Sequence, residues 1–213
     1  MDLASQASGL ATGAVGMVAQ QATTDSTIKE MAVPKGTVWF TGLSGAGKTT
    51  VATTLKAILD SQDVRTFMLD GDLLREGLNS DLTFSDDDRI ENVRRVGEVA
   101  LLFATVGHLS LVTVISPYAD GRERVRSRHT TLGIPFVEVF VATPLAECES
   151  RDPKGLYARA RRGEVTRFTG ISAPYEEPDD AELKLVTHDK TPMESALEVL
   201  ALLEAQGLVT PEA

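Results

Sequence analysis

Residues 42–49 read G-L-S-G-A-G-K-T, which fits the pattern of Gly, any four residues, Gly, Lys and then Ser or Thr. Because its glycines lack side chains, such a loop can fold round a phosphate chain with its backbone N–H groups pointing inward. Lys48 would then reach the β- and γ-phosphates, and the Thr49 hydroxyl would help to hold Mg2+. The sequence therefore predicts a phosphate-binding loop (P-loop) for a nucleoside triphosphate. Its predicted binding residues are Gly42, Leu43, Ser44, Gly45, Ala46, Gly47, Lys48, Thr49 and Thr50.

The residues on either side of this loop are those that the motif requires. Residues 37–41 read T-V-W-F-T, a run of β-branched and aromatic residues typical of a buried strand. After the loop, Val51, Leu55, Ile58 and Leu59 recur at helical spacing. The order of strand, glycine loop and helix favours a working motif over a glycine-rich turn before a surface helix.

Two carboxylates, Asp70 and Asp72, directly follow a second predicted strand at residues 64–69. Beside a triphosphate, one carboxylate can anchor Mg2+ while the other orients or deprotonates an attacking hydroxyl. Thr49 and Asp70 are the candidate metal residues, although the sequence leaves open which aspartate has which role. The pair favours phosphoryl transfer, and the alternative is a tight turn, which an Asp-Gly pair also favours.

Three further polar residues suit an anionic substrate. Arg75 lies three residues after Asp72, and Arg89 and Asn92 lie three apart, so that they share one face of a helix. An arginine fork and an amide would bind a nucleotide, although each arginine taken singly is typical of a solvated surface.

The charge balance reverses between residues 151 and 167, where only Asp152 and Glu164 are acidic. Such a cluster beside a phosphate site predicts a lid that closes over polyanions and excludes water. The alternative is one exposed basic helix. The cations are Arg151, Lys154, Arg159, Arg161, Arg162 and Arg167.

The remaining strands are predicted at residues 109–115, 136–141 and 183–186. Ser85, with Asp88 three residues later, predicts a capping box that opens a helix to about Val106. A second capping box at residues 191–194 opens the closing helix. The apolar faces expected for these helices are Ile90, Val93, Gly97, Ala100, Leu101 and Ala104, and Met193, Ala196, Leu197, Leu200 and Leu203.

Strands that alternate with helices predict an α/β fold with a doubly wound parallel sheet. Ligands bind beyond the carboxyl ends of the strands in such a sheet, so residues 42–49, 70–72 and 116–118 should converge on one crevice. Residues 34–213 are predicted to form this domain. Residues 1–33, rich in Ala, Gly, Ser, Thr and Gln, are predicted to be a mobile extension, with a partner-binding arm as the alternative.

Composition narrows the class of protein. The formal charge of −10, from 21 Lys and Arg against 31 Asp and Glu, argues against non-specific binding of nucleic acid. Cys148 is the single cysteine, so an intrachain disulfide is excluded, and we expect Cys148 to pack as a small apolar group. Apolar runs are too short for a membrane span and no basic segment opens a signal peptide, so we expect a cytoplasmic enzyme without a membrane partner.

The candidate site residues belong to a set of short motifs that follow one another along the chain. From about residue 35 to residue 203 the chain resembles the adenylylsulfate kinase (APS kinase) family of the P-loop kinase superfamily. The matching motifs are G-L-S-G-A-G-K-T-T at 42–50, D-G-D at 70–72, G-L-N-S-D-L at 77–82, F-S at 84–85, D-R at 88–89, E-N-V-R-R-V-G-E-V-A at 91–100, I-S-P-Y at 115–118, R-D-P-K-G-L-Y at 151–157, F-T-G-I at 168–171 and P-Y-E at 174–176.

The resemblance implies an activity. Enzymes of this family use ATP and Mg2+ to phosphorylate the 3'-hydroxyl of adenosine 5'-phosphosulfate, giving 3'-phosphoadenosine 5'-phosphosulfate for sulfate assimilation. The resemblance also implies a homodimer. Lys48, Asp70, Asp72 and Ser116 are the implied catalytic residues, and Arg151 joins the ATP site. The implied substrate residues are Asp72, Arg75, Phe84, Arg89, Asn92, Ile115, Ser116, Lys154 and Phe168.

The resemblance implies particular roles for two phenylalanines and one serine. Phe84 and Phe168 would sandwich the adenine between aromatic faces. Ser116 matches a serine described in some members as a phosphorylated intermediate, but we favour substrate binding because in-line transfer needs no enzyme nucleophile.

The chain also departs from the family's common pattern at four positions. Leu73 stands where the family commonly has Asn, Thr83 and Arg167 each stand where it has Gly, and Ala142 stands where it has Asp. Leu73 would remove a polar group from the substrate site, and Arg167 would put a long cation at the substrate mouth. A kinase of the same fold with another hydroxylated acceptor is therefore one alternative. The other is a non-catalytic nucleotide-binding module.

Overall fold

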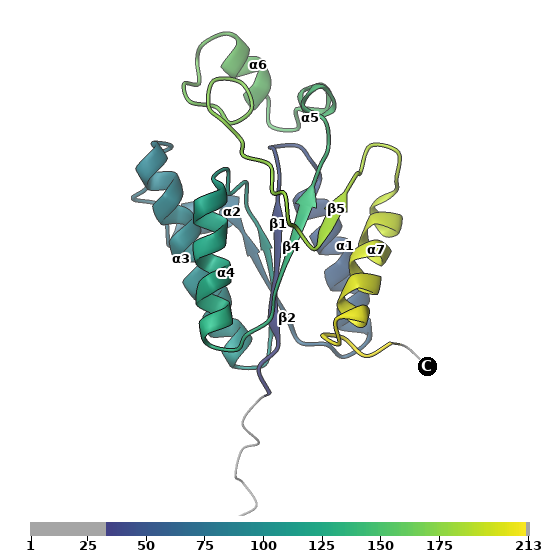
Figure 1. The fold of residues 1–213 in the computed structure, drawn as a ribbon. Coiled ribbons are helices and arrows are strands. Elements are labelled where there is room, and N and C mark those ends of the chain that lie inside the picture. Colours follow the sequence, from purple (N-terminus) through teal and green to yellow (C-terminus); the bar gives the residue numbers. More distant parts are fainter. Residues whose placement is uncertain (1–32, 212–213) are drawn as a thin grey trace, which may run out of the picture. The chain divides into compact units, whose positions relative to one another are not determined.

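The computed structural model describes residues 33–211, which form one parallel sheet in the order β2-β3-β1-β4-β5. The strands are β1 (Gly36–Thr41), β2 (Thr66–Asp70), β3 (Leu109–Thr113), β4 (Phe136–Val141) and β5 (Leu183–Leu185). The helices are α1 (Lys48–Ser61), α2 (Gly71–Glu76), α3 (Asp86–Thr105), α4 (Ala119–Thr131), α5 (Leu145–Arg151), α6 (Leu156–Arg161) and α7 (Pro192–Ala205). Helices α3 and α4 cover one face of the sheet and α1 and α7 cover the other (Figure 1), which confirms the predicted doubly wound fold.

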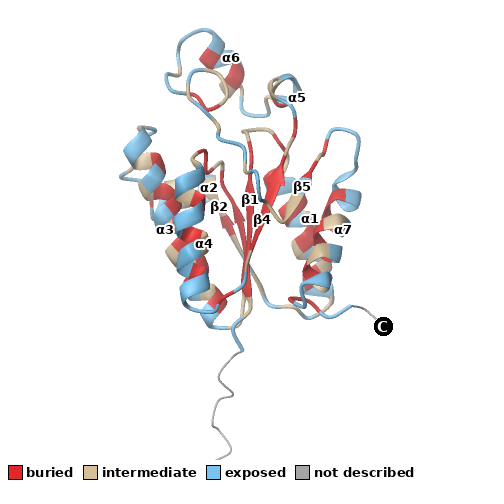
Figure 2. Cartoon of the chain, viewed as in Figure 1, coloured by how far each residue is buried: buried red, intermediate tan, exposed pale blue. Residues whose placement is uncertain are grey.

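The central strand β1 is buried along its whole length (Figure 2). Because successive side chains of a strand point to opposite faces, Val38 and Phe40 join the core under α1 and α7, whereas Trp39 joins the core under α3 and α4. Both cores are apolar, as expected for a parallel sheet covered on both faces. Cys148 lies in the first core as a free, buried thiol, as predicted.

Side-chain caps fix where the long helices begin. Thr191 and Glu194 form a complete capping box with Pro192 as the first helical residue, as predicted. Ser85 caps α3 by accepting from the backbone N–H of Asp88, but the predicted return contact is missing from the described structure. The Asp88 carboxylate accepts instead from the backbone N–H of Thr83, 3.0 Å away, so it secures the loop before the helix.

Several element limits and faces differ from the prediction. Strand β2 begins two residues later than predicted because the N–H of Val64 closes the turn after α1 by bonding to Leu59. Ile90, Met193 and Leu197 were predicted to face the core, but all three are exposed. Each lies at the edge of its helix's apolar stripe, where helical spacing alone does not fix burial. The other predicted positions on these helices are buried.

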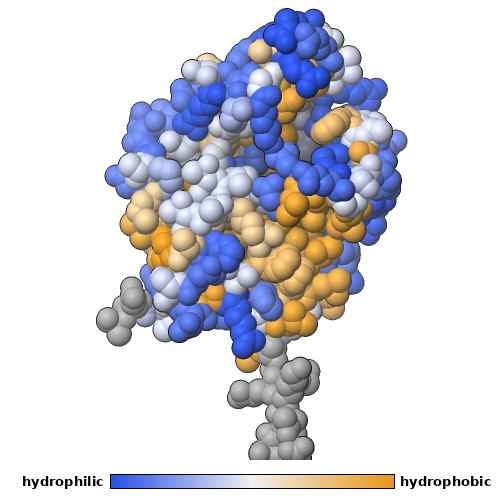
Figure 3. All heavy atoms as spheres, turned by 180° about the vertical axis from the view of Figure 1, so that it is seen from behind, coloured by the Kyte–Doolittle hydropathy of each residue, from blue (hydrophilic) through white to orange (hydrophobic). Residues whose placement is uncertain are grey.

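The surface is unevenly composed. Seen from behind, the end that carries α5 and α6 is strongly hydrophilic, whereas hydrophobic side chains gather lower down (Figure 3). Within residues 33–211 no helix is long and apolar enough to cross a lipid bilayer. The predicted extension at residues 1–33 lies outside the described residues apart from Val33, so its mobility stays a prediction.

Candidate active site

A cavity of about 650 Å3 lies beyond the carboxyl ends of β1, β2 and β3. Its walls contain the P-loop, the Asp70–Asp72 turn and residues 115–117, so the predicted convergence is confirmed. All nine predicted acceptor residues line the same cavity. A more open hollow of about 430 Å3, against Leu43, residues 170–175 and Glu177, has Glu177 as its one charged lining residue. The larger cavity is therefore the candidate active site.

The P-loop has the geometry that its glycines permit. Gly42, Gly45 and Gly47 all have positive φ, and a Cβ atom at Gly42 would lie 2.6 Å from the carbonyl oxygen of Val141. All three positions therefore need glycine for conformation, and Gly42 also needs it for space. The side chains of Leu43 and Ala46 do not line the cavity, so these residues can contribute there only through their backbone.

Lys48 points into the loop rather than into solvent. Its ammonium donates to the carbonyl oxygens of Gly42 (2.9 Å) and Leu43 (2.8 Å). Burial disfavours the charged form and lowers the pKa of Lys48 from 10.5 to about 8. Arg151 approaches the same loop, with Nη1 3.5 Å from the carbonyl oxygens of Gly45 and Ala46. Both predicted ATP-binding cations therefore lie at the P-loop.

Asp70 is the centre of a small network of oxygen atoms. Its Oδ2 accepts from the hydroxyls of Thr49 (2.9 Å) and Thr113 (2.8 Å), and its Oδ1 accepts from the backbone N–H of Asp72 (3.0 Å). Burial alone would raise the pKa of Asp70, but the hydrogen bonds from Thr113, Thr49 and the backbone outweigh it and lower the pKa. Asp70 therefore stays ionised beside the P-loop.

This oxygen set fits Mg2+, which prefers carboxylate, hydroxyl, phosphate and water oxygens. No group of three or more His, Cys, Asp or Glu residues that could hold a metal occurs within residues 33–211. A Mg2+ ion beside Thr49 and Asp70 would therefore need phosphate oxygens and water to complete its shell. That is the usual arrangement when the metal arrives with a nucleotide.

Asp72 faces the lid. Its carboxylate forms an ion pair with Lys154, which lies between α5 and α6, and both side chains are half or more exposed. Thus the two aspartates differ: Asp70 is held by hydroxyls at the P-loop, whereas Asp72 is held by a cation at the cavity mouth. Sequence reasoning could not make this distinction.

The aromatic residues predicted for the acceptor site also line the cavity. The Arg75 guanidinium lies over the Phe84 ring, 4.3 Å from its centroid. Phe84 is exposed, whereas Phe168 is buried and packs edge-on against Tyr157 with centroids 4.9 Å apart. Both rings border the cavity, and the adenine sandwich stays a prediction.

Arg89 lines the cavity, and each of its three guanidinium nitrogens donates to an acceptor within the protein. Its Nε donates to the carbonyl oxygen of Phe84 (3.0 Å), Nη1 to the Thr169 hydroxyl (2.6 Å) and Nη2 to the carbonyl oxygen of Arg167 (2.5 Å). The guanidinium therefore joins the two segments that carry the aromatic rings. Asn92 accepts from Asn79 Nδ2 at 3.0 Å, which leaves its own amide donors for the cavity. No sequence pattern indicated this role for Asn79.

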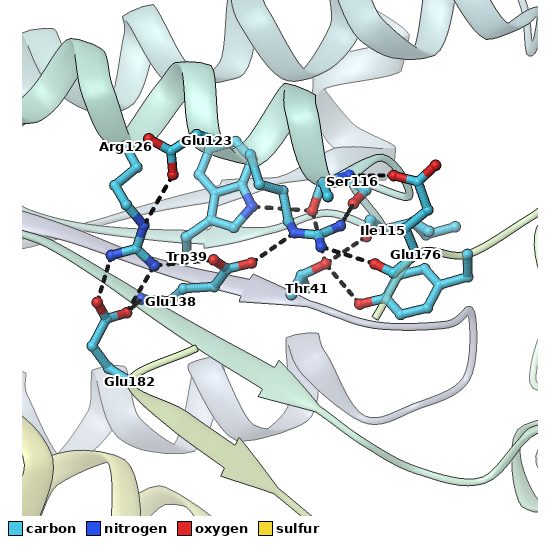
Figure 4. A network of polar contacts seen from close by, with 12 residues as sticks. Trp39, Thr41, Ile115, Ser116, Glu123, Arg126, Glu138, Glu176 and Glu182 are labelled. Carbon is cyan, nitrogen blue, oxygen red and sulfur yellow. Dashed lines mark hydrogen bonds and ion pairs between the residues drawn. The ribbon is translucent and has the colours of Figure 1, made fainter. Parts of the chain in front are cut away.

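Ser116 is a buried residue in a strained conformation, with 2% exposure and φ of 42°. Its hydroxyl accepts from Trp39 Nε1 (3.0 Å) and donates to Thr41 Oγ1 (2.9 Å), and Thr41 in turn donates to the carbonyl oxygen of Ile115 (Figure 4). The hydroxyl proton is thus already used within the protein. This geometry favours our expectation that Ser116 shapes the substrate site over a role as nucleophile.

The departures from the family pattern lie away from the cavity lining. Leu73 is 64% exposed, and Ala142 donates its backbone N–H to Leu185. Arg167 has φ of 55°, and its exposed guanidinium lies 3.8 Å from Asp86. Thr83 bonds to Asp88 and so supports the loop before Phe84. Because neither Leu73 nor Arg167 lines the cavity, the structure does not support the effects on the acceptor site that were expected of these two residues.

The predicted basic segment is not one helix, because α5 ends at Arg151 and α6 begins at Leu156. Both helices lie beyond the carboxyl end of the sheet (Figure 1), as a lid over the cavity requires. Each of the six cations has a carboxylate within 4 Å, and most of these acids come from outside the segment. The partners are Glu147, Asp72, Glu164, Glu149 and Asp86.

Comparisons with known proteins agree with this site. The sequence profile of the family described as "Adenylylsulphate kinase" matches residues 35–186. The "Bifunctional enzyme CysN/CysC" of Mycobacterium tuberculosis is 53% identical over 175 residues, which are 82% of this chain and 28% of that enzyme. An adenylyl-sulfate kinase of Marinobacter nauticus is 49% identical over 81% of this chain and 85% of its own length.

Solved structures give the same result. The Mycobacterium tuberculosis APS kinase CysC, in complex with AMPPNP and APS, superposes with a TM-score of 0.79 at 53% identity. That comparison covers 81% of this chain and 99% of the solved one. Because the family profile covers most of the chain and relatives share about half of its residues, the chain belongs to the adenylylsulphate kinase family.

Proposed function

We propose that this chain transfers the γ-phosphoryl group of ATP to the 3'-hydroxyl of adenosine 5'-phosphosulfate. The bond between the 3'-oxygen and the γ-phosphorus forms while the bond from that phosphorus to the β,γ-bridging oxygen breaks. The products are ADP and 3'-phosphoadenosine 5'-phosphosulfate, and the hydroxyl proton is released. Direct transfer of this kind needs positioning and charge stabilisation rather than an enzyme nucleophile.

The residues divide between the two substrates. Lys48, Arg151 and the P-loop N–H groups bind the triphosphate, and Thr49 and Asp70 hold Mg2+, which neutralises charge on the phosphate oxygens. Asp72 orients the acceptor hydroxyl and takes its proton. This assignment is supported by the two hydroxyls that donate to Asp70, whereas Asp72 pairs with the half-exposed ammonium of Lys154.

The acceptor lies against the opposite wall. Arg75, Asn92 and Lys154 supply donors for its anionic groups, and Phe84 and Phe168 stack on the adenine. Arg89 acts by holding the two ring-bearing segments together. The observation that carries the whole proposal is the meeting of Lys48, Asp70 and this wall in one cavity.

A coupled assay for ADP release tests the proposal. Turnover with adenosine 5'-phosphosulfate should require Mg2+ and should fall at least about 1,000-fold in Lys48→Ala, because the loop then lacks its cation for transition-state charge. Lys56→Ala, on the exposed side of the same helix, is the matched control and should keep full activity. Absence of turnover by the wild-type chain would refute the assignment.

Two alternatives have their own tests. A different acceptor would appear as a higher kcat/KM for another hydroxylated nucleotide or metabolite when candidates are ranked. A non-catalytic module would bind ATP in calorimetry yet transfer phosphate to no acceptor. The ionised Asp70 beside Thr49 and Lys48 favours catalysis over that second alternative.

We also expect a homodimer in the cytoplasm. Light scattering of the purified chain should give twice the monomer mass of 22.9 kDa. A mass of one chain would contradict the dimer without affecting the proposed reaction. Fractionation of cells should recover the chain with cytoplasmic enzymes.

A further inference from the structure

The wall formed by residues 115–117 needs a physical explanation. It lines the cavity, yet at its centre Ser116 is a non-glycine residue with φ of 42°. A positive φ is unfavourable for such a residue, and it persists only when surrounding contacts impose it. The contacts around Ser116 should therefore reveal which residues set the position of this wall.

One guanidinium provides the strongest of these contacts. Arg122, on α4, is 2% exposed, and its Nη1 donates to the carbonyl oxygen of Ser116 at 2.7 Å. Its Nη2 donates to the carbonyl oxygen of Glu176 at 2.8 Å. Arg122 therefore joins the cavity wall to the segment that returns from the lid, and a lysine could not make both contacts in this fork geometry.

A chain of charged side chains, in which Arg122 and Glu138 are buried and Arg126 and Glu182 are partly exposed, holds Arg122 in place. Its Nε lies 2.7 Å from Glu138 Oε1, although the N–H does not point at that oxygen, so charge rather than a hydrogen bond holds this pair. The other oxygen of Glu138 accepts from Arg126, which also pairs with Glu182 (Figure 4). Two arginines thus alternate with two glutamates.

The alternation of positive and negative side chains restricts the movement of the Arg122 guanidinium. An unpaired buried charge is unfavourable, so Arg122 cannot leave Glu138 without leaving its own buried guanidinium and the carboxylate oxygen Oε1 without an ionic partner. The two ends of Ser116 are then fixed independently: Trp39 and Thr41 hold its hydroxyl, and Arg122 holds its carbonyl oxygen.

We propose that Arg122 is a positioning residue that fixes the wall at residues 115–117 for the acceptor nucleotide, with Glu138 holding its guanidinium. The inference rests on the proposed function, because this wall belongs to the acceptor side of the cavity. A buried ion pair that served only the core would stabilise the whole domain equally. A positioning residue acts selectively on one substrate.

Steady-state kinetics on the full chain separate these roles. In Arg122→Lys and Arg122→Met, we expect the KM for adenosine 5'-phosphosulfate to rise about 10-fold to 100-fold, since small displacements at a site have effects of that size. The KM for ATP should change by less than about twofold. Glu138→Gln should shift the same KM in the same direction.

Two controls remove the effect of reduced stability. Arg124→Met changes an exposed arginine on the same helix. Val199→Ala creates a cavity in the core beside α7, far along the chain from residues 115–117. Neither should alter the ratio of the two KM values, although Val199→Ala should lower the melting temperature. An equal rise of both KM values in the Arg122 variants, or no rise, would overturn the proposal.

Amide hydrogen exchange provides a readout that does not depend on turnover. Exchange at residues 115–119 should be about 10-fold faster in Arg122→Met or Glu138→Gln, while exchange in α7 stays within about twofold of the wild type. Unchanged exchange at these residues would refute the inference. If the wild-type chain has no activity on the acceptor, the proposed function fails while this measurement still decides the role of Arg122.

Discussion

We expect Lys48 to lower the free energy of unfolding of the ligand-free protein, although the reaction requires this residue. Its ammonium is buried against two carbonyl oxygens of the P-loop, and burial lowers its pKa to about 8. A group that binds its proton less tightly in the folded state destabilises that state when protonated. Replacement by Met should therefore stabilise the ligand-free protein at neutral pH.

The structure sets the size and the pH window of this effect. The fall in the pKa from 10.5 to about 8 corresponds to a penalty of about 3 kcal/mol. Met would leave the carbonyl oxygens of Gly42 and Leu43 without their donor, so we expect a net gain of about 1–2 kcal/mol. Below pH 8 the penalty is complete. Between pH 8 and 10.5 the unfolded chain binds more protons, so wild-type stability should rise relative to the variant.

Urea unfolding of the wild type and Lys48→Met at pH 7, 8, 9 and 10 measures this difference. Between pH 7 and pH 10 the wild type should gain about 2.5 kcal/mol on the variant, so the two free energies of unfolding should converge and then cross. The variant should lose turnover at every pH. Lys56→Met, which alters a partly exposed lysine that pairs with Asp60 on the same helix, should change with pH as the wild type does. Parallel curves for the wild type and Lys48→Met over this range would refute the reasoning.

Three further predictions concern other parts of the fold. A Cβ atom at Gly97 would lie 2.7 and 2.9 Å from the methyl carbons of Val125, so Gly97→Ala should lower the free energy of unfolding in urea by about 1–2 kcal/mol. Val125→Ala should recover much of that loss when both changes are present, and an additive double variant would count against the clash. Asp70→Asn should raise the Mg2+ concentration needed for half-maximal rate, whereas Asp72→Asn should lower kcat at least about 100-fold without that shift; an equal effect on both parameters would contradict the division of roles. Arg167→Gly should raise the urea midpoint by relieving a positive φ, a gain of up to about 1 kcal/mol. Arg167→Ala removes the same exposed ion pair but keeps the strain, and an equal gain in that variant would show that strain is not the cause.

Local patterns predicted the parts of the site that neighbouring residues determine. The glycine spacing at residues 42–49 needs positive φ at fixed positions, so the loop, the strand before it and the helix after it could be recognised together. The convergence of three separate segments could also be predicted, because parallel strands bring their carboxyl ends to one edge of a sheet. Thr191 and Glu194 fixed the start of the last helix by their own hydrogen bonds.

The burial of polar side chains that bond to residues distant in the sequence could not be predicted. Helix α4 reads as a polar surface helix, with Val125 as its single large aliphatic residue. Its buried face also contains Arg122 and His129, and each is satisfied by groups on other elements, such as the Thr37 hydroxyl 2.9 Å from His129 Nε2. The role of Arg89 was missed for the same reason, since its acceptors at residues 167 and 169 lie far along the chain.

The paired cations of the lid affect how nucleotides reach the cavity. With a net charge of −10 and a carboxylate beside each of the six cations, the protein offers little long-range attraction to an anion in solution. Encounters with ATP should then speed up, rather than slow down, as added salt screens the repulsion. Recognition of the polyanion would begin only at short range, when its phosphates compete with the acids for Lys154 and Arg151.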